Sequence, residues 1–247
     1  PHSLPMMSKC FRALLVLPLA IASCLAAAPA DFTELFNGKD LTGWRGGDTY
    51  DHRKLLALPA AERDALIAKW TASLTEQKNG RPHWSADKGE LLNDGLGGYA
   101  TTDRDYGDFE FLVDWKITTG TDSGIYLRGV PQIQIWDPAM PDPNNNGSAK
   151  GSGGLWNNDK KSPGRDPLVR ADNPVGQWNR FRVLMVGSRV SVWLNDQLVV
   201  DHGLKTFASR VDYLRTGSDE LALEQMREFL DQKPEIVAGQ SRYGIST

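Results

Sequence analysis

Three short runs of residues between positions 109 and 137 alternate apolar and polar side chains, the pattern of half-buried β-strands. Their polar positions hold carboxylates, cations, amides and aromatic rings, a mixture that a hydrophobic core does not need. Sugars are bound by aromatic plates beside convergent planar polar groups, so the mixture favours a carbohydrate-facing sheet over a merely solvated face. The candidate side chains are Glu110, Asp114, Lys116, Tyr126, Arg128, Gln132, Gln134 and Trp136.

The other faces of these runs are apolar. Val113 and Trp115 flank Asp114 in the sequence, and Ile133 and Ile135 flank Gln134. If the three runs are neighbouring strands, one sheet buries its aliphatic face and presents all of the polar candidates on the other. The expected site depends on that condition.

The spacing of the carboxylates gives no support to an ordinary glycosidase, although it does not exclude one. Such enzymes use two carboxylates about 5 to 9.5 Å apart. Glu110 and Asp114 share a face but lie four residues apart on one strand, about 13 Å at about 3.3 Å per residue. Asp137 lies at a strand end and approaches Asp114 only if the strand register is favourable.

A weak calcium candidate lies in the segment Asp-Pro-Asn-Asn-Asn-Gly. Asp142, Asn144 and Asn146 match the opening of an EF-type loop, but position twelve is Gly153 instead of glutamate. The pattern therefore fails where the bidentate ligand belongs, and a polar turn is the simpler interpretation. Calcium is the one cofactor that the sequence suggests.

Composition excludes several other classes of protein. The 247 residues carry a net charge of -3 without a Lys/Arg cluster, so no nucleic-acid partner is expected. The histidines at positions 52, 83 and 202 are scattered, without zinc-like spacing. We find neither a phosphate-binding glycine loop nor a Gly-x-Ser-x-Gly nucleophile motif.

The N-terminal 30 residues are expected to be a secretory signal peptide, with residues 1–5 preceding a start at Met6 or Met7. A short basic region precedes an apolar run, Ala13–Ala28, that is too short for a membrane span. Two processing sites compete: a small-x-small site that frees Asp31, and a lipobox-like site that lipidates Cys24. Export to the periplasm, the outer membrane or the exterior is expected, with membrane contact only through the signal peptide or a lipid anchor.

The elements that must position the candidates are mostly strands. Hairpin turns are expected at Gly187-Ser188 and Asn195-Asp196, and a helical insert at 59–74, where apolar residues recur every four positions. The long Pro/Gly/Asn stretch 138–174 contains Trp156, a further candidate for ligand binding. The regular strand spacing predicts an all-β, antiparallel two-sheet sandwich over residues 31–202.

The C-terminal stretch 203–247 has a different character and is expected to be an atypical tail. Ser218 could cap a helix over residues 219–232, which the Lys-Pro pair at 233–234 would end.

Six motifs together resemble the 3-keto-disaccharide hydrolase family, over roughly Phe32 to Asp201. They are FTELFNGKDLTGW, YGDFEFLVDWK, DSGIYLRG, PQIQIWD, GQWNRFRV and VSVWLNDQLVVD. The resemblance implies a concanavalin-like jelly roll and exported bacterial proteins, hydrolases or lyases, that cleave sugars already oxidised at C3. One departure is that the family's closing strand, with its Phe-Arg-Asn-Ile-like segment, does not follow His202.

The chemistry that the resemblance implies starts at C2 of the sugar, whose proton the C3 ketone acidifies. A base removes that proton, the enolate expels the C1 substituent, and water can then add. Asp114 is the expected base, Arg128 or Lys116 would hold the enolate oxygen, and Gln134 would fix a hydroxyl. The competing interpretation of Asp114 is an ion pair with Lys116 or Arg128 that stabilises the sheet.

The substrate would contact side chains from all three runs and the long loop. The expected contacts are Glu110, Tyr126, Gln132, Gln134, Trp136 and Trp156. A non-catalytic, lectin-like carbohydrate-binding module on the same fold is the alternative function, because one fold can host both.

Overall fold

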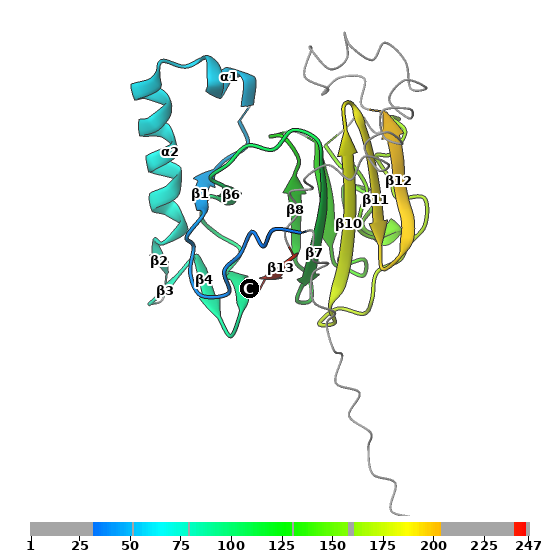
Figure 1. Ribbon diagram of the computed structural model, residues 1–247. Helices are drawn as coiled ribbons and strands as arrows, with labels where there is room; N and C mark the ends of the chain where they lie inside the picture. Colours follow the sequence, from blue (N-terminus) through cyan, green and yellow to red (C-terminus); the bar gives the residue numbers. More distant parts are fainter. Residues whose placement is uncertain are drawn as a thin grey trace, which may run out of the picture.

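The computed structural model describes residues 32–50, 52–78, 80–129, 131–157, 161–203 and 240–245. Strands form most of its regular structure, so the protein is mainly β (Figure 1). Helices α1 (His52–Ala57) and α2 (Ala60–Leu74) and the 3-10 turn Ser148–Lys150 are the helical elements of the described chain. In these ranges no helix is both long and apolar enough to cross a bilayer. The expected signal peptide with Cys24, and the helix expected at 219–232, lie outside the described residues.

One layer is a seven-stranded sheet whose members come from both ends of the described chain. All neighbours pair antiparallel except β13, which runs parallel to both β5 and β7. The expectation of a purely antiparallel sandwich is therefore wrong at this strand. The order is β12 (Gln197–Gly203), β11 (Arg189–Leu194), β10 (Asn179–Val186), β7 (Phe109–Lys116), β13 (Gln240–Ile245), β5 (Glu90–Asn93) and β4 (Trp84–Asp87).

The second layer consists of two antiparallel pairs and one added segment. Residues 153–156 lie alongside β9, where Gly153 N donates to Gln134 O and Gln134 N donates to Gly154 O, at 2.8 and 2.9 Å. An isolated bridge joins Ile133 and Leu155. The pairs are β1 (Trp44–Gly47) with β6 (Tyr99–Thr102), and β8 (Asp122–Tyr126) with β9 (Gln132–Trp136). A separate two-residue hairpin, β2 (Gln77–Lys78) with β3 (Arg81–Pro82), follows α2.

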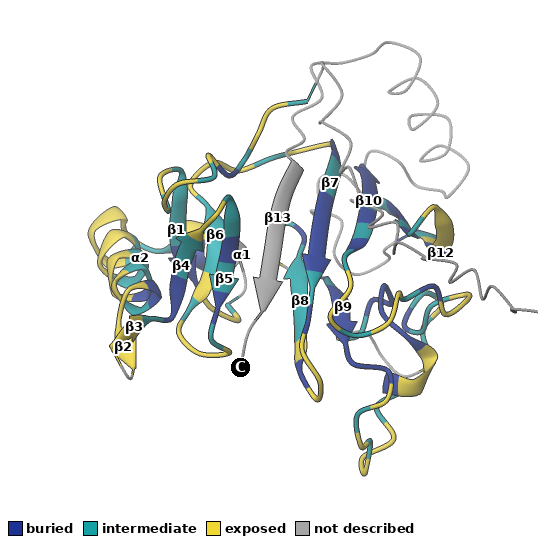
Figure 2. Ribbon diagram, turned by 90° about the horizontal axis from the view of Figure 1, so that it is seen from below, coloured by how far each residue is buried: buried dark blue, intermediate teal, exposed yellow. Residues whose placement is uncertain are grey.

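The main core lies between these layers. Val113 and Trp115 of β7, Ile133 and Ile135 of β9 and Phe181 of β10 belong to one buried cluster. Both isoleucines are 0% exposed. The core-facing positions expected from the sequence are therefore confirmed for β7 and β9, although Asp114 and Gln134, which alternate with them, are only 1% and 2% exposed. Strands β7 and β10 are among the most buried strands in Figure 2.

The predicted turns and the predicted helix are confirmed. Val186 pairs with Arg189 across Gly187-Ser188, and Leu194 pairs with Gln197 across Asn195-Asp196. Asn195 and Asp196 have φ values of 50° and 67°, the left-handed conformation of a two-residue hairpin turn. Helix α2 begins directly after Pro59, whereas the sequence did not predict α1.

Helix α2 covers the second layer at the end of the molecule opposite β12 (Figure 1). Its buried residues Trp70 and Leu74 face inward, and Leu74 joins a second apolar cluster with Trp84 and Leu91. A Cβ at Gly46 of β1 would overlap the backbone of Trp70. Glycine at this position therefore permits the close approach of helix and strand.

Candidate functional site

The two layers turn their polar faces in opposite directions. Trp115 of β7 and Ile135 of β9 are buried in the same core, so the side chains that alternate with them point away from that core on opposite sides of the sandwich. Strand β8 pairs with β9 and not with β7. The expectation that all polar candidates share one sheet face is therefore wrong, because alternation does not specify which strands become neighbours.

On the outer side of the seven-stranded sheet, Asp114 is ion-paired with Arg180 of β10, which stands directly opposite it. Arg180 Nε and Nη2 donate to the two carboxylate oxygens at 2.6 and 2.8 Å. Asp114 is only 1% exposed, and its hydrogen bond raises the pKa of the Arg180 guanidinium. An ion pair was the competing interpretation of Asp114, and the described residues show one with Arg180, where Lys116 or Arg128 was expected. The role of Asp114 as a base stays a prediction.

The neighbouring candidates on β7 take part in similar pairs. Glu110 accepts a hydrogen bond from Arg182, whose guanidinium lies 4.5 Å from the centre of the Trp193 ring. Lys116 Nζ lies 3.8 Å from Glu90 and 4.5 Å from the centre of the Trp178 ring. This side of the sheet is thus a ladder of cross-strand ion pairs and stacked cations.

Arg128 ties loops together at the far end of β8. It has a φ of 50° and donates to the carbonyls of Gly107 and Gly187 and to Asp108, at 2.9, 2.7 and 2.8 Å. These bonds link the start of β7 to the β10–β11 turn. The structure therefore does not bring Arg128 together with Asp114.

The outer face of the second layer gathers the remaining candidates. We define the outer face as the side of β8, β9 and residues 153–156 that is turned away from the core. Directly opposed residues in antiparallel strands project to the same side, which places nine residues on this face in three rows. The rows are Tyr126–Gln132–Trp156, Gly124–Gln134–Gly154 and Asp122–Trp136–Ser152.

Two of the expected contact residues on this face are covered. Trp136 is 4% exposed, and its indole nitrogen donates to Gly151 O at 2.8 Å. The expectation that Trp136 stands open on a polar surface is therefore wrong, because residues 151–152 pack against it. Gln134 is 2% exposed, and its amide donates to the Asp122 carboxylate at 3.2 Å.

The open part of the outer face carries a pair of stacked tyrosines. The rings of Tyr126 and Tyr99 lie 5.4 Å apart at an interplanar angle of 19°. Tyr99 comes from β6, so the stack connects the two strand pairs of the second layer. The Tyr99 hydroxyl lies 2.7 Å from the Thr49 hydroxyl. Burial, with the nearby Tyr99 and Asp122, raises the pKa of Tyr126, which therefore stays protonated at neutral pH.

Asp122 is exposed at the edge of the same face. Desolvation of its carboxyl group raises its pKa, and this effect outweighs the opposing hydrogen bond from Gln134. Asp122, Tyr99 and Thr49 were not predicted from the sequence as site residues. Strand parity was the available signal for Asp122, since it stands two and four residues before Gly124 and Tyr126. No local pattern links Tyr99 or Thr49 to this strand.

Residues 165–167 close one end of the outer face. A Cβ at Gly154 would lie 2.5 Å from the Arg165 carbonyl oxygen and 3.1 Å from Pro167. The Arg165 guanidinium lies 5.7 Å from the centre of the half-buried Trp156 ring. Trp156 therefore forms a wall of the site beside Gln132. Within the described residues its buried indole nitrogen has no hydrogen-bond partner.

The Asp142 loop is a hydrogen-bonded turn. The Asp142 carboxylate accepts bonds from the backbone amides of Asn146 and Gly147 at 2.6 and 2.7 Å. Amides thus occupy the oxygens that a calcium ion would need. In the described part of the chain, no group of three histidine, cysteine or acidic residues is arranged to hold a metal.

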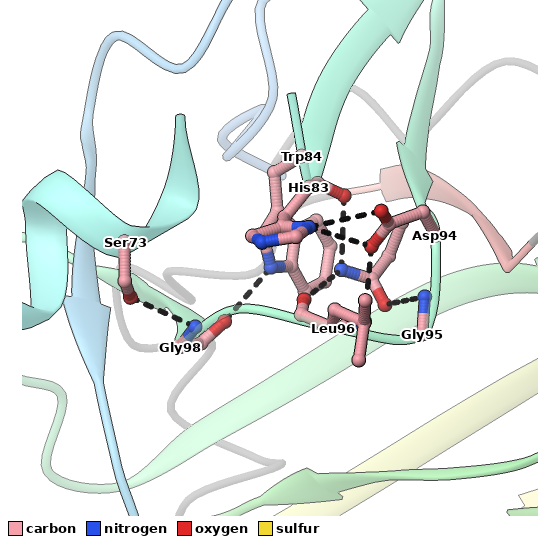
Figure 3. A network of polar contacts seen from close by, with 8 residues as sticks. Ser73, His83, Trp84, Asp94, Gly95, Leu96 and Gly98 are labelled. Atoms are coloured by element: carbon pink, nitrogen blue, oxygen red, sulfur yellow. Dashed lines mark hydrogen bonds and ion pairs between the residues drawn. The ribbon is translucent and has the colours of Figure 1, made fainter. Parts of the chain in front are cut away.

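A polar network supports the loop that leads into Tyr99 (Figure 3). The Asp94 carboxylate contacts His83 Nδ1 at 2.9 Å and accepts a bond from Leu96 N at 3.0 Å. At the end of the loop, Gly98 N donates to Ser73 Oγ at 2.9 Å, and Gly98 O accepts a bond from Trp84. The network therefore anchors residues 94–98 to α2 and β4.

We expect Asp94→Asn to lower the free energy of unfolding by about 1–2 kcal/mol at pH 7. This is below the roughly 1.5–3 kcal/mol usual for hydrogen bonds to a charged group, because the Asp94 side chain is 29% exposed. Burial raises the pKa of Asp94, but the bonds from His83 and Leu96 together lower it further, so the net pKa lies below its ordinary value. This stabilisation is present above about pH 4 and is lost as the pH falls through the pKa of the folded state. Urea unfolding between pH 3 and 7 should show the difference from wild type shrinking on the acid side. A difference that grew below pH 4 would contradict the assignment, and Asp87→Asn is the exposed control.

Two strand layers, one with an aromatic, amide and carboxylate outer face, define the class of the protein as strand-rich and two-layered. The model of the 3-keto-α-glucoside-1,2-lyase-like domain family matches residues 31–225, and the chain belongs to this family. A relative in Bacteroides thetaiotaomicron, named 3-keto-disaccharide hydrolase, is 24% identical in a 191-residue alignment that covers 71% of this chain. The chain spans 59% of that relative's length.

Two solved structures of candidate glycosyl hydrolases from Parabacteroides distasonis are also similar. The first is 21% identical with a TM-score of 0.44, and the match covers 73% of this chain and 76% of the other. The second is 23% identical with a TM-score of 0.39, covering 49% of this chain and 62% of the other.

Proposed function

We propose that the protein is an exported enzyme that cleaves 3-keto-glycosides at the outer face of the second layer, within a jelly-roll fold. Membership of the 3-keto-α-glucoside-1,2-lyase-like family supports the reaction class. The observation that carries the location is the Tyr99–Tyr126 stack, which presents aromatic surface on the same face as the Asp122 carboxylate. Aromatic plates beside planar polar groups suit a sugar ring.

The chemistry depends on the ketone at C3, which acidifies the neighbouring C2 proton. A carboxylate takes that proton, the enolate expels the C1 substituent, and hydration of the resulting enone completes a net hydrolysis. Release before hydration would make the same enzyme a lyase. The site must also supply a hydrogen-bond donor at the ketone oxygen, where negative charge develops.

The alternative is a lectin-like module that binds the sugar without cleaving it. The bond between Asp122 and Gln134 favours this alternative, because a carboxylate that is held by an amide can also simply accept bonds from sugar hydroxyls. The two functions differ in whether a proton is transferred.

Incubation with a 3-keto-glucoside and with its unoxidised parent tests the proposal. We expect cleavage of the oxidised sugar alone, read by mass spectrometry of the products, because only the ketone makes the C2 proton removable. A C2-deuterated substrate should react more slowly if proton removal limits the rate. Equal cleavage of both sugars would indicate an ordinary glycosidase, and binding without cleavage of either would indicate the lectin.

Export rests on the basic and apolar N-terminal segment and its two processing sites. If the lipobox-like site is used, labelled palmitate should enter the protein and Cys24→Ala should abolish the label. An unlabelled mature protein beginning at Asp31 would indicate the other site, and an unprocessed cytoplasmic protein would contradict export.

A further inference from the structure

We propose that Asp122 is the carboxylate that accepts the C2 proton of the substrate, that Gln132 donates to the C3 oxygen, and that Gln134 positions Asp122. This inference rests on the function proposed above and names the side chains that perform its first step. It rests on the arrangement of three alternate positions of β8, which are Asp122, Gly124 and Tyr126, and of their partners on β9.

Asp122 is accessible to a substrate, whereas Asp114 is not. Asp122 is exposed, and Gln134 Nε2 donates to its Oδ2 at 3.2 Å. Within the described residues no hydrogen bond engages Oδ1, which is left to meet a substrate. By contrast, Asp114 has both oxygens bonded to Arg180 and is 1% exposed. A base must reach within about 3 Å of the proton that it removes.

The surface between Asp122 and Tyr126 has room for a sugar ring. Asp122 lies two positions before Gly124 and Tyr126 two positions after it, so about 13 Å of strand separates them. A Cβ at Gly124 would overlap the amide group of Gln132, so the Gln132 side chain lies across this glycine. A sugar ring between Tyr126 and Asp122 would therefore lie over an amide that can donate to its ketone oxygen.

The Asp122 carboxylate is also more basic than an ordinary surface carboxylate. The partly desolvated carboxyl group of Asp122 has a raised pKa, which makes its carboxylate a stronger proton acceptor than an ordinary surface aspartate. The hydrogen bond from Gln134 opposes that shift and holds the carboxylate in place. Because Gln134 is itself buried, its amide is a fixed support for the base.

The proton and electron movements then balance. Asp122 takes the C2 proton, the C2–H electrons form a C2=C3 bond, and the carbonyl electrons move to the oxygen beside Gln132. Collapse of this enolate forms a C1=C2 bond and breaks the bond from C1 to the leaving-group oxygen, which takes a proton from water. The hydroxide left by that water adds to C1 and regenerates the C2=C3 enolate. This enolate takes the proton back from Asp122 at C2 as the carbonyl re-forms, so Asp122 regains its charge.

The test uses the full chain and its Asp122→Asn, Asp122→Glu and Asp87→Asn variants. We expect Asp122→Asn to reduce kcat about 100- to 10,000-fold, the usual contribution of a positioned base, with little change in KM. Exchange of the C2 hydrogen with deuterated water, read by NMR on a 3-keto-glucoside, should stop in the same variant. Asp122→Glu should restore part of both signals, and the exposed control Asp87→Asn should match wild type.

The positioning role of Gln134 has a separate readout. Its hydrogen bond lowers the pKa of Asp122, so Gln134→Met should raise that pKa and move the acid limb of the kcat/KM profile to higher pH. A merely structural glutamine would reduce the rate equally at all pH values.

The outcomes separate the inference from the proposed function. Wild-type cleavage of the 3-keto-glucoside with undiminished cleavage by Asp122→Asn would overturn the role of Asp122 and leave the proposed function standing. Equal loss of activity in Asp122→Asn and Asp122→Glu, with a lowered Tm in both variants, would also overturn that role. Exchange of the C2 hydrogen that persists in Asp122→Asn would overturn it as well. No turnover by wild type would overturn both.

Discussion

Asp114→Asn should lower the free energy of unfolding by about 2–3 kcal/mol while changing the kcat of the folded protein only a few-fold. Asp114 is 1% exposed and holds Arg180 through two hydrogen bonds of 2.6 and 2.8 Å. Removing one partner of a buried pair costs about 3–5 kcal/mol when the other charge is stranded. We expect a smaller loss, because the Arg180 side chain is 34% exposed and can turn toward water.

Urea unfolding gives the stability, and turnover of a 3-keto-glucoside gives the rate. Asp87→Asn makes the same chemical change at an exposed position and should be neutral. A double-mutant cycle with Arg180→Met should recover much of the loss, because the stranded cation is then absent. A loss of kcat of about 100-fold or more at unchanged stability would instead identify Asp114 as the base.

Trp115→Ala should be more damaging, with a loss of about 3–5 kcal/mol in the free energy of unfolding. Trp115 is 1% exposed in the main core, and its ring centre lies 5.3 Å from that of Phe181 on the adjacent strand β10. Alanine would leave a cavity between the layers, which the flanking strands can fill only in part.

Trp115→Phe is the matched variant. Within the described residues the buried indole nitrogen of Trp115 has no hydrogen-bond partner. Phenylalanine keeps most of the aromatic volume and removes this unpaired donor, whose burial costs about 1–3 kcal/mol. We therefore expect the free energy of unfolding of Trp115→Phe to remain within about 1 kcal/mol of wild type. Removal of the unpaired donor stabilises the fold by nearly as much as the lost packing destabilises it. A loss as large as that of alanine would show that the nitrogen is bonded in solution.

Asp114 and Asp122 show that carboxylates have different partners on the two sides of the sandwich. On the seven-stranded sheet, Asp114 stands directly opposite Arg180, and Glu110 lies diagonal to Arg182, so each carboxylate is paired with an arginine of the adjacent strand. On the outer face of the second layer, Asp122 has an amide as its bonded neighbour, so its charge is not compensated by a cation within that bond. An uncompensated, partly desolvated carboxylate is suited to proton transfer, whereas a bidentate ion pair is suited to holding strands together.

The sequence by itself determined the strands between residues 109 and 137, their core-facing sides and the hairpin turns at 187–188 and 195–196. Period-two alternation assigned Val113, Trp115, Ile133 and Ile135 to the core, because successive side chains of a strand must project to opposite sides. The Asn195-Asp196 turn was equally local, since short polar residues tolerate the left-handed conformation that such a turn requires. The motifs also carried the family assignment, which the match over residues 31–225 confirms.

Only the tertiary structure decided which polar faces meet. Alternation predicts that Asp114 and Trp136 point away from the core residues next to them in the sequence. It does not predict from which side of the sandwich each of them projects. Asp114 pairs with Arg180, 66 residues later in the chain, and Tyr126 stacks on Tyr99 of a different strand pair. Loop residues 151–152 cover Trp136. Long-range pairing and loop packing set these neighbours, and neither leaves a periodic signal in the local sequence.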